Sequence, residues 1–308
     1  MKYKFSVLVP VYFNEKNISS TVAHLKKLQD LLPEWELEFV FVDDGSGDKS
    51  FQLLEEEHKK DKRVKIVKLS KNFGSMLAIQ AGLEYVSGDC VGIISADLQD
   101  PPELFIPMIE KWKDGRKIVL AVRKDREESF SQKVIANTFY NLMAKYAIKD
   151  YPPGGFDFVL VDRKVVDDLK QIREKNTNIM SLIFWLGYDR DTIEYTRRKR
   201  TVGKSRWTLA KKIKLFIDSF VSFSYFPIRA ISAIGLTTAT CSLCYGIFVA
   251  INALLGRITV AGFASMMIII TFLLGLVMIM MGIVGEYLWR ILDEVRKRPP
   301  FIVEDVIK

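Results

Sequence analysis

The amino-terminal part of the chain alternates short apolar runs with segments whose apolar positions recur at helical spacing. Short apolar runs are typical of buried strands, and amphipathic periodicity is typical of helices packed on a sheet. Strands are predicted at Phe5–Val9, Leu37–Val42, Val64–Leu69, Cys90–Ile94 and Ile118–Val122. Helices are predicted between them at Ile18–Leu31, Phe51–Lys59, Ser75–Val86 and Glu103–Lys113. This order predicts an α/β fold with a doubly wound, mostly parallel sheet.

Two long stretches near the carboxyl end, Ala230–Leu255 and Ile258–Gly285, carry no charged residue. At 1.5 Å per residue each is long enough to cross a hydrocarbon core of about 30 Å. Only Gly256 and Arg257 separate them, so a transmembrane helical hairpin is predicted. The predicted organisation is a globular domain at 1–200, a basic juxtamembrane segment at 201–227, the hairpin at 228–290 and a tail at 291–308.

The formal net charge is +8, and much of the excess lies on either side of the hairpin. By the positive-inside rule, the globular domain and both termini are expected in the cytoplasm, with the hairpin as a multi-pass anchor in the inner (plasma) membrane. Met1–Lys4 leads directly into the first strand, so no secretory signal is expected. Charge gathered beside a membrane favours anionic lipid or phosphate as partner and argues against nucleic acid.

The juxtamembrane segment carries an apolar stripe at helical spacing, with lysines at other angles. Such a stripe predicts an amphipathic helix, either lying in the membrane interface or packed on the globular domain; the pattern leaves both open. The stripe consists of Leu209, Ile213, Phe216, Ile217 and Phe220.

Polar residues follow each predicted strand, where open α/β sheets bind their ligands. They are Tyr12–Glu15, Asp43–Ser46, Asn72–Gly74, Asp97 with Gln99, and Arg123. Carboxylates suit ribose hydroxyls or a divalent ion, Gly45 and Gly74 permit close backbone approach, and Arg123 suits a phosphate. The set predicts a sugar-nucleotide site.

The stretch Ser95–Glu103 is the most informative part of that rim. It places carboxylate and amide oxygens just beyond an apolar strand, and Pro101 and Pro102 end the strand and start a helix. The stretch predicts a site for a metal and a charged leaving group; the alternative is an exposed acidic turn.

Several common active sites are excluded. Gly45-Ser46-Gly47 lacks the third glycine of a dinucleotide fingerprint, and Gly203-Lys204-Ser205 lacks the first glycine of a P-loop. His24 and His58 lie in amphipathic helical patterns beside lysines and are expected to face solvent. The three cysteines are expected to be reduced packing residues, because none belongs to a zinc-binding pattern.

Four motifs together resemble the family 2 glycosyltransferases with a GT-A fold, and within them the polyprenyl-phosphate glycosyltransferases, which include bactoprenol glucosyltransferases and dolichyl-phosphate mannose synthases. The motifs are Val9–Glu15, Val42–Ser46, Lys71–Gly74 and Ala96–Glu103, and the likeness extends through Gly154–Phe158 and Arg200–Arg206 to the hairpin. The resemblance implies an inverting transfer of a hexose to polyprenyl (undecaprenyl) phosphate at the cytoplasmic face, with Mg²⁺ or Mn²⁺, giving a lipid-linked sugar donor for cell-envelope glycosylation. Glucose from UDP-glucose is preferred; GDP-mannose and UDP-N-acetylhexosamine stay open, and relatives suggest a homotetramer.

The resemblance also implies roles for individual residues. Asp97 and Gln99 would hold the metal, and Asp97 and Asp157 would be catalytic, Asp157 by orienting the sugar rather than as a base. The donor would contact Pro10, Tyr12, Glu15, Val42, Asp44, Ser95, Ala96 and Arg123. The acceptor and donor phosphates would contact Arg200, Lys204, Ser205 and Arg206. Plain alternatives are that Asp157 fixes the neighbouring glycine turn and that the basic residues are surface charge.

Two positions depart from the family pattern. Relatives usually carry Asp where this chain has Ser95, and often Arg where it has Gln132. The loss of a carboxylate at 95 predicts weaker metal binding and raises a rival from another class, a catalytically silent sugar-nucleotide-binding scaffold. A processive polysaccharide synthase is disfavoured, because two spans offer little for a channel and the Gln-x-x-Arg-Trp sequence is absent.

Overall fold

The computed structural model describes residues 2–123, 138, 141–149, 151–152, 156–198, 217–255 and 262–308. They form two compact units. The first comprises Met1–Ser222 together with Pro299–Lys308, and the second is Phe223–Arg298.

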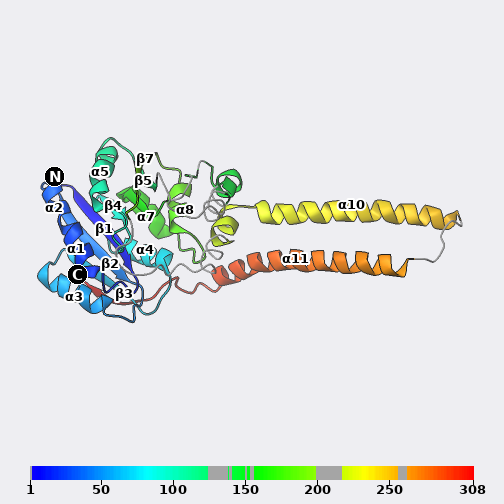
Figure 1. Ribbon diagram of the computed structural model, residues 1–308, viewed down its shortest axis with the longest axis horizontal. Helices are drawn as coiled ribbons and strands as arrows, with labels where there is room; N and C mark the ends of the chain where they lie inside the picture. The colour runs from blue at the N-terminus through cyan, green and yellow to red at the C-terminus, as the bar shows by residue number, and fades with distance from the viewer. Residues whose placement is uncertain are drawn as a thin grey trace. The chain divides into compact units, whose positions relative to one another are not determined.

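The first unit is built on an eight-stranded, mostly parallel sheet with the order β7-β5-β6-β4-β1-β2-β3-β8 (Figure 1). Only β6 and β8 run antiparallel to the strands beside them. The strands are β1 Lys4–Val11, β2 Glu36–Asp43, β3 Val64–Leu69, β4 Cys90–Ile93, β5 Ile118–Arg123, β6 Phe158–Asp162, β7 Arg190–Tyr195 and β8 Val303–Ile307.

Helices connect successive strands and bury the central ones, which explains their nearly continuous apolar runs. Phe5, Phe39, Phe41, Phe105 and Phe158 are among the largest fully buried side chains. The helices of this unit are α1 Ile18–Lys26, α2 Leu28–Leu31, α3 Ser50–Lys60, α4 Ser75–Leu83, α5 Phe105–Lys113, α7 Arg163–Gln171 and α8 Ile179–Trp185, with a 3₁₀ turn η1 at Pro102–Leu104.

The prediction of a doubly wound, mostly parallel sheet followed by two apolar helices is confirmed. The five predicted strands are β1 to β5. The helix predicted over Ile18–Leu31 is divided at Lys27 into α1 and α2. The expectation for His58 is wrong: its ring is buried, and its Nδ1 lies 2.6 Å from the Val64 carbonyl oxygen.

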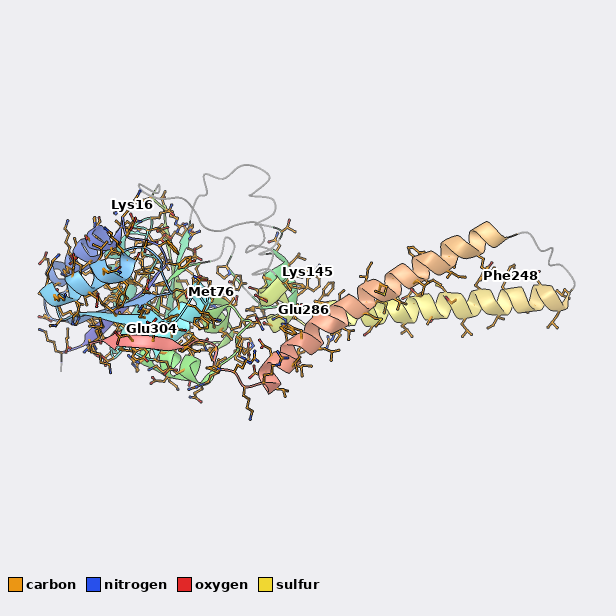
Figure 2. The ribbon with its side chains drawn as sticks, turned by 90° about the horizontal axis from the view of Figure 1, so that it is seen from below. Lys16, Met76, Lys145, Phe248, Glu286 and Glu304 are labelled. Carbon is orange, nitrogen blue, oxygen red and sulfur yellow. The ribbon has the colours of Figure 1, made fainter. Side chains whose placement is uncertain are left out.

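The strand β8 follows the two long helices and returns the chain to the sheet. It pairs antiparallel with β3, and Figure 2 labels Glu304 on β8. Lys68 on β3 forms a 2.8 Å ion pair with Glu304. The backbone N–H of Ser70 donates to the Ile302 carbonyl, which extends the pairing to the loop after β3. Val303–Ile307, within the sequence 291–308 expected as a tail, therefore forms one edge of the sheet.

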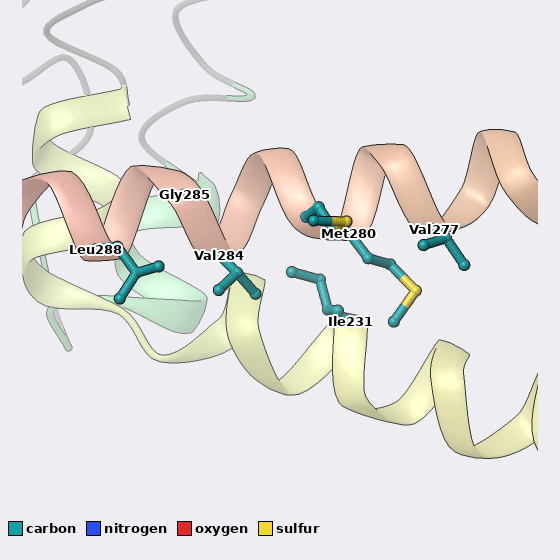
Figure 3. Close-up of a pocket in the computed structure, with 7 residues that line it drawn as sticks. Ile231, Val277, Met280, Val284, Gly285 and Leu288 are labelled. Atoms are coloured by element: carbon teal, nitrogen blue, oxygen red, sulfur yellow. The ribbon is translucent and has the colours of Figure 1, made fainter.

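The second unit consists of α10, Phe226–Leu254, and α11, Phe263–Val295. Each contains a window long and apolar enough to cross a membrane, at Phe226–Tyr245 and Phe272–Val295. Between the helices lies an apolar groove, lined in part by Ile231, Val277 and Met280 (Figure 3). Side chains such as Phe248 point outward from α10 and are exposed (Figure 2).

The predicted juxtamembrane helix lies largely outside the described residues, which resume at Ile217. The boundaries proposed from the sequence for the four segments stay predictions. Of the three cysteines, Cys90 is buried in β4 as expected; Cys241 and Cys244 are free thiols on α10.

Candidate active site

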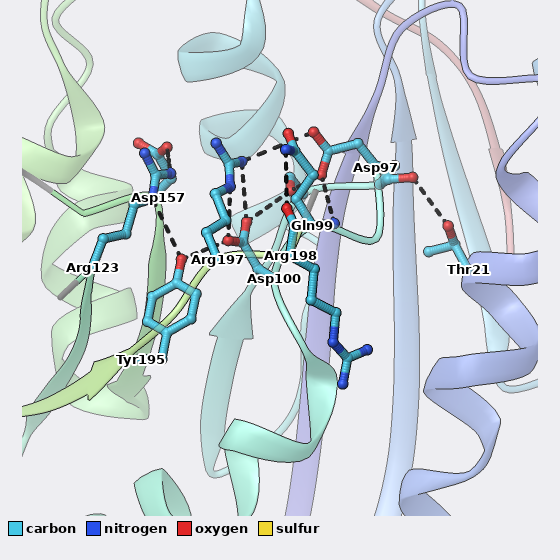
Figure 4. A network of polar contacts seen from close by, with 11 residues as sticks. Thr21, Asp97, Gln99, Asp100, Arg123, Asp157, Tyr195, Arg197 and Arg198 are labelled. Atoms are coloured by element: carbon cyan, nitrogen blue, oxygen red, sulfur yellow. Dashed lines mark hydrogen bonds and ion pairs between the residues drawn. The ribbon is translucent and has the colours of Figure 1, made fainter. Parts of the chain in front are cut away.

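The candidate site lies where the parallel strands end. Asp97 follows β4, Arg123 ends β5 and Tyr195 ends β7. Asp157 immediately precedes β6, which runs antiparallel to β4 and β5, so its position falls at the same edge of the sheet. The structure thus brings together Asp97, Arg123 and Asp157, which are separated along the chain (Figure 4).

The turn after β4 is held by its own polar groups. The Ser95 hydroxyl lies 2.8 Å from Asp97 Oδ1, and the Gln99 N–H donates to the same oxygen at 3.2 Å. Leu98 between them has φ 58°, a left-handed conformation that is costly for a residue with a side chain. Such conformations gather at functional sites, where the surrounding contacts hold them in place.

Asp100 closes this turn and was not singled out from the sequence. Its side chain is fully buried, and it accepts hydrogen bonds from the Tyr195 hydroxyl at 2.5 Å and from Arg197 Nε at 3.1 Å. The Ser95 hydroxyl lies 3.1 Å from its other oxygen. Arg197 Nη2 also lies 3.9 Å from Asp97 Oδ2. Figure 4 shows Asp100 between Tyr195 and Arg197.

Arg123 joins the turn to Asp157. Its Nε lies 3.5 Å from the Tyr195 hydroxyl, and its Nη2 pairs with Asp157 Oδ2. Burial opposes the charge on Arg123, but Asp157 and Tyr195 outweigh it and raise the pKa of the guanidinium. Burial and the Asp100 carboxylate raise the pKa of Tyr195, which therefore keeps its proton and donates it.

Asp44 holds the neighbouring loop after β3. Its carboxylate accepts from the backbone N–H of Phe73 at 2.7 Å, from that of Gly74 at 2.9 Å and from the Asn72 side-chain amide at 2.9 Å. Asp43 is also buried, and burial raises its pKa. The predicted contact of Asp44 with the nucleoside stays a prediction; the observed contacts show that it orders the loop 72–74.

The other residues predicted to contact the donor lie at or shortly after the carboxyl ends of β1 and β2. Glu15 Oε2 accepts from the Lys49 N–H at 3.2 Å, and the ring of Tyr12 meets Phe13 edge-on. Pro10 lies in β1 beside Val42 of β2, whose side chain is fully buried. The contact of each with the donor stays a prediction.

Hydrogen bonds of Ala96 and Gln99 hold the turn after β4 to neighbouring segments. The Ala96 carbonyl accepts from the Thr21 hydroxyl at 3.0 Å, which fastens the turn to α1. The Gln99 side-chain amide donates to the Arg198 carbonyl at 3.3 Å, and the Arg198 N–H donates back to the Gln99 carbonyl at 2.9 Å. The turn is therefore tied to the segment after β7.

Arg200, Lys204, Ser205, Arg206 and Gln132 lie outside the described residues. Within the described part, no group of three or more histidine, cysteine, aspartate or glutamate side chains is arranged to hold a metal ion. The assignment of Asp97 and Gln99 to a metal stays a prediction.

Gly45 offers a test of the donor-side loops. It has φ +66°, and a Cβ there would lie 2.4 Å from the Lys71 carbonyl carbon, so Gly45→Ala must push the Lys71–Gly74 loop away from Asp44. We expect a loss of about 1–3 kcal/mol in stability and a roughly tenfold higher KM for the sugar nucleotide. Thermal unfolding and donor kinetics measure both.

Gly115→Ala is the matched control for this prediction. Gly115 also has a positive φ, +99°, but a Cβ there meets nothing within 4 Å. This variant should lose roughly 1–2 kcal/mol from backbone strain and keep the wild-type KM. Equal KM values for both variants would contradict a role of the loop in donor binding.

Comparisons with known proteins agree with this geometry. Residues 6–169 match the family described as glycosyl transferase family 2. The chain is 39% identical over 302 residues to the uncharacterized glycosyltransferase YkcC of Bacillus subtilis, covering 98% of this chain and 93% of that protein. It is 36% identical over 302 residues to the SfII prophage-derived bactoprenol glucosyl transferase of Shigella flexneri, covering 98% and 97%.

A more distant likeness is to the solved mannosyltransferase PcManGT of Pyrobaculum calidifontis, with 17% identity, a TM-score of 0.48, and coverage of 70% of this chain and 61% of that one. At this level the likeness carries no argument about the reaction. The matched domain and the near full-length relatives show the family: the chain belongs to glycosyl transferase family 2.

Proposed function

We propose that this protein transfers a hexose from a sugar nucleotide to a polyprenyl phosphate with inversion, giving a lipid-linked sugar. The observation that carries the proposal is the single polar network in which Asp97, on the donor side, is joined to Asp157, at the assigned acceptor position. Relatives named bactoprenol glucosyl transferase, similar over 98% of the chain, support this acceptor class. UDP-glucose is the preferred donor on the same ground.

The chemistry asks little of a general base. A lipid phosphate is already anionic at neutral pH, so the enzyme needs to align it with the anomeric carbon and to stabilise the leaving diphosphate. Asp157 is paired with Arg123, whose charge it stabilises, which favours an orienting role for Asp157 over proton removal. The Arg123 guanidinium offers further donors to a phosphate or a sugar hydroxyl.

Asp97 and Gln99 would hold Mg²⁺ or Mn²⁺. One carboxylate and one amide fit a cation bound chiefly by substrate phosphates and water, because Mg²⁺ is commonly held by one or two carboxylates plus phosphates. When bound, the cation would neutralise charge that develops on the leaving diphosphate. With Ser95 in place of the usual aspartate, Asp97 would be the carboxylate of this turn that holds the cation.

The anchor is proposed to be the α10–α11 hairpin, with the catalytic domain and both termini on the cytoplasmic side of the plasma membrane. The two apolar helices and the basic residues around them support this arrangement. Arg200, Lys204, Ser205 and Arg206 are proposed to meet the phosphates next to the bilayer, and a homotetramer is proposed from the resemblance.

A donor panel tests the proposal. Purified protein is incubated with undecaprenyl phosphate, Mg²⁺ and radiolabelled UDP-glucose, GDP-mannose or UDP-N-acetylglucosamine, and label is counted in the chloroform phase. We expect transfer from one donor, UDP-glucose first. Donor binding without transfer from any of the three would instead support the silent scaffold that the exchange at Ser95 raises.

A further inference from the structure

We propose that Asp100 is a positioning residue of the donor site: it holds the Arg197 guanidinium at 3.1 Å, so that the ion pair of Arg197 with Asp97 stays long, at 3.9 Å, and a divalent cation can compete for the Asp97 carboxylate. The inference rests on the proposed function, in which Asp97 meets that cation. Nothing in the sequence motif assigns such a role to Asp100 or Arg197, and both come from the contacts among the described residues.

The Asp100 carboxylate is surrounded by donors on both oxygens. Oδ1 accepts from the Tyr195 hydroxyl at 2.5 Å and from Arg197 Nε at 3.1 Å. Oδ2 lies 3.1 Å from the Ser95 hydroxyl and accepts from Arg197 Nη2 at 3.4 Å. The side chain is fully buried. A buried carboxylate with this many donors, one of them charged, is a strong anchor for the arginine.

Arg197 lies between two carboxylates. It makes two contacts with Asp100, whereas its approach to Asp97 is longer, at 3.9 Å. If Asp100 lost its charge, Asp97 would be the carboxylate nearest to the Arg197 guanidinium among the described residues. The guanidinium would then move toward Asp97. Arginine and a metal ion would then compete for the same oxygens, because both seek a carboxylate in a partly desolvated site.

Ser95 fits between the same two carboxylates. Its hydroxyl lies 2.8 Å from Asp97 and 3.1 Å from Asp100, so a single neutral group bridges them. An aspartate at 95 would set three carboxylates around one arginine. With serine at 95, two carboxylates rather than three surround Arg197. The position of the Arg197 charge therefore has more influence on how well Asp97 binds a cation.

Asp100→Asn tests the role with little change in shape. In either orientation of the amide, its NH₂ faces an Arg197 N–H, so the anchor is lost on one side. We expect at least a tenfold weaker affinity for Mn²⁺, measured by electron paramagnetic resonance with UDP and without acceptor. Tyr195→Phe, which removes only one donor, should weaken Mn²⁺ binding by about threefold.

Recovery of Mn²⁺ affinity by a second substitution distinguishes a positioning role of Asp100 from simple loss of structure. In the double variant Asp100→Asn with Arg197→Met, the Arg197 charge no longer competes for Asp97, so Mn²⁺ affinity should return to within about threefold of wild type. A collapsed turn would stay weak in the double variant. Asp191→Asn, on the same strand as Tyr195 but paired with Lys111 at 2.6 Å, is the control and should bind Mn²⁺ like wild type.

Two outcomes overturn the inference: wild-type Mn²⁺ affinity in Asp100→Asn, or no recovery in the double variant. Because this measurement needs neither acceptor nor turnover, it stays distinct from the proposed reaction. Wild-type protein that binds Mn²⁺ with UDP but transfers no sugar would refute the proposed function and leave the role of Asp100 standing.

Discussion

Asp97→Asn is expected to lower turnover by at least ~10²-fold, because the charge that holds the cation at the leaving diphosphate is worth several kcal/mol in the transition state. The substitution tests the charge of Asp97 with little change in structure. An asparagine can still offer Oδ1 to the Ser95 hydroxyl and the Gln99 N–H, so the turn keeps its hydrogen bonds while the charge is removed. Initial rates over a Mg²⁺ titration measure the effect.

The matched control for Asp97→Asn is Asp114→Asn, at the exposed end of α5. It makes the same chemical change far from the rim and should leave turnover within twofold of wild type. If Asp97→Asn retains activity near that of the control, Asp97 does not carry the cation, and the assignment of the whole turn falls with it.

Glu38→Leu is expected to cost about 3 kcal/mol of stability, the second large effect. Glu38 is buried in β2 and accepts from the Ser6 hydroxyl at 2.5 Å and the Ser87 N–H at 2.8 Å, and it pairs with Lys65. Leucine would leave the Lys65 ammonium without this partner in a mostly buried place. Denaturant unfolding of the full chain in detergent measures the loss.

The same group predicts a pH dependence. Burial alone would raise the pKa of Glu38, but hydrogen bonds from Lys65, Ser6 and Ser87 outweigh it, and the pKa is lowered from its ordinary 4.5. A carboxyl whose folded-state pKa is depressed stabilises the fold above its unfolded pKa and loses that contribution as the pH falls below it. The stability gap between wild type and Glu38→Leu should therefore be full at pH 7 and shrink below about pH 4.5.

Two variants check the origin of that gap. Glu36→Gln removes an exposed partner of Lys4 from the same strand and should cost less than about 0.5 kcal/mol. Glu38→Leu combined with Lys65→Met replaces both charges by apolar groups and should recover part of the loss. A pH-independent gap would mean that lost packing, rather than the ionised carboxylate, causes the destabilisation.

The sequence pattern predicted β1 to β5 because each is a short apolar run bounded by turn residues. It did not predict β7, whose residues Arg190–Tyr195 alternate weakly, or β8, where Val303–Ile307 contains two acidic residues. Both are edge strands, which are solvated on one side, so their hydrophobic signal is weak. β6 is apolar but lies beyond a long stretch without a clear pattern.

The residues of the site also divide into those that the sequence predicted and those that it did not. Asp97, Gln99 and Arg123 could be found because each lies at or shortly after the end of an apolar strand. Tyr195 and Arg197 lie 95 and 97 residues from Asp100 along the chain and meet it because β7 pairs with β5, an arrangement that no local pattern records. In the sequence, Arg197 is one of several basic residues before the hairpin, and nothing local distinguishes it.

The position of β8 has a consequence for how this protein is made. Because β8 follows α11, a ribosome must synthesise both long helices before the chain that covers β3 exists. Until then β3 presents an open edge, the kind of surface that pairs with other chains. Synthesis of α10 and α11 therefore precedes completion of the sheet, and a nascent chain that ends before β8 would hold an unfinished, aggregation-prone domain.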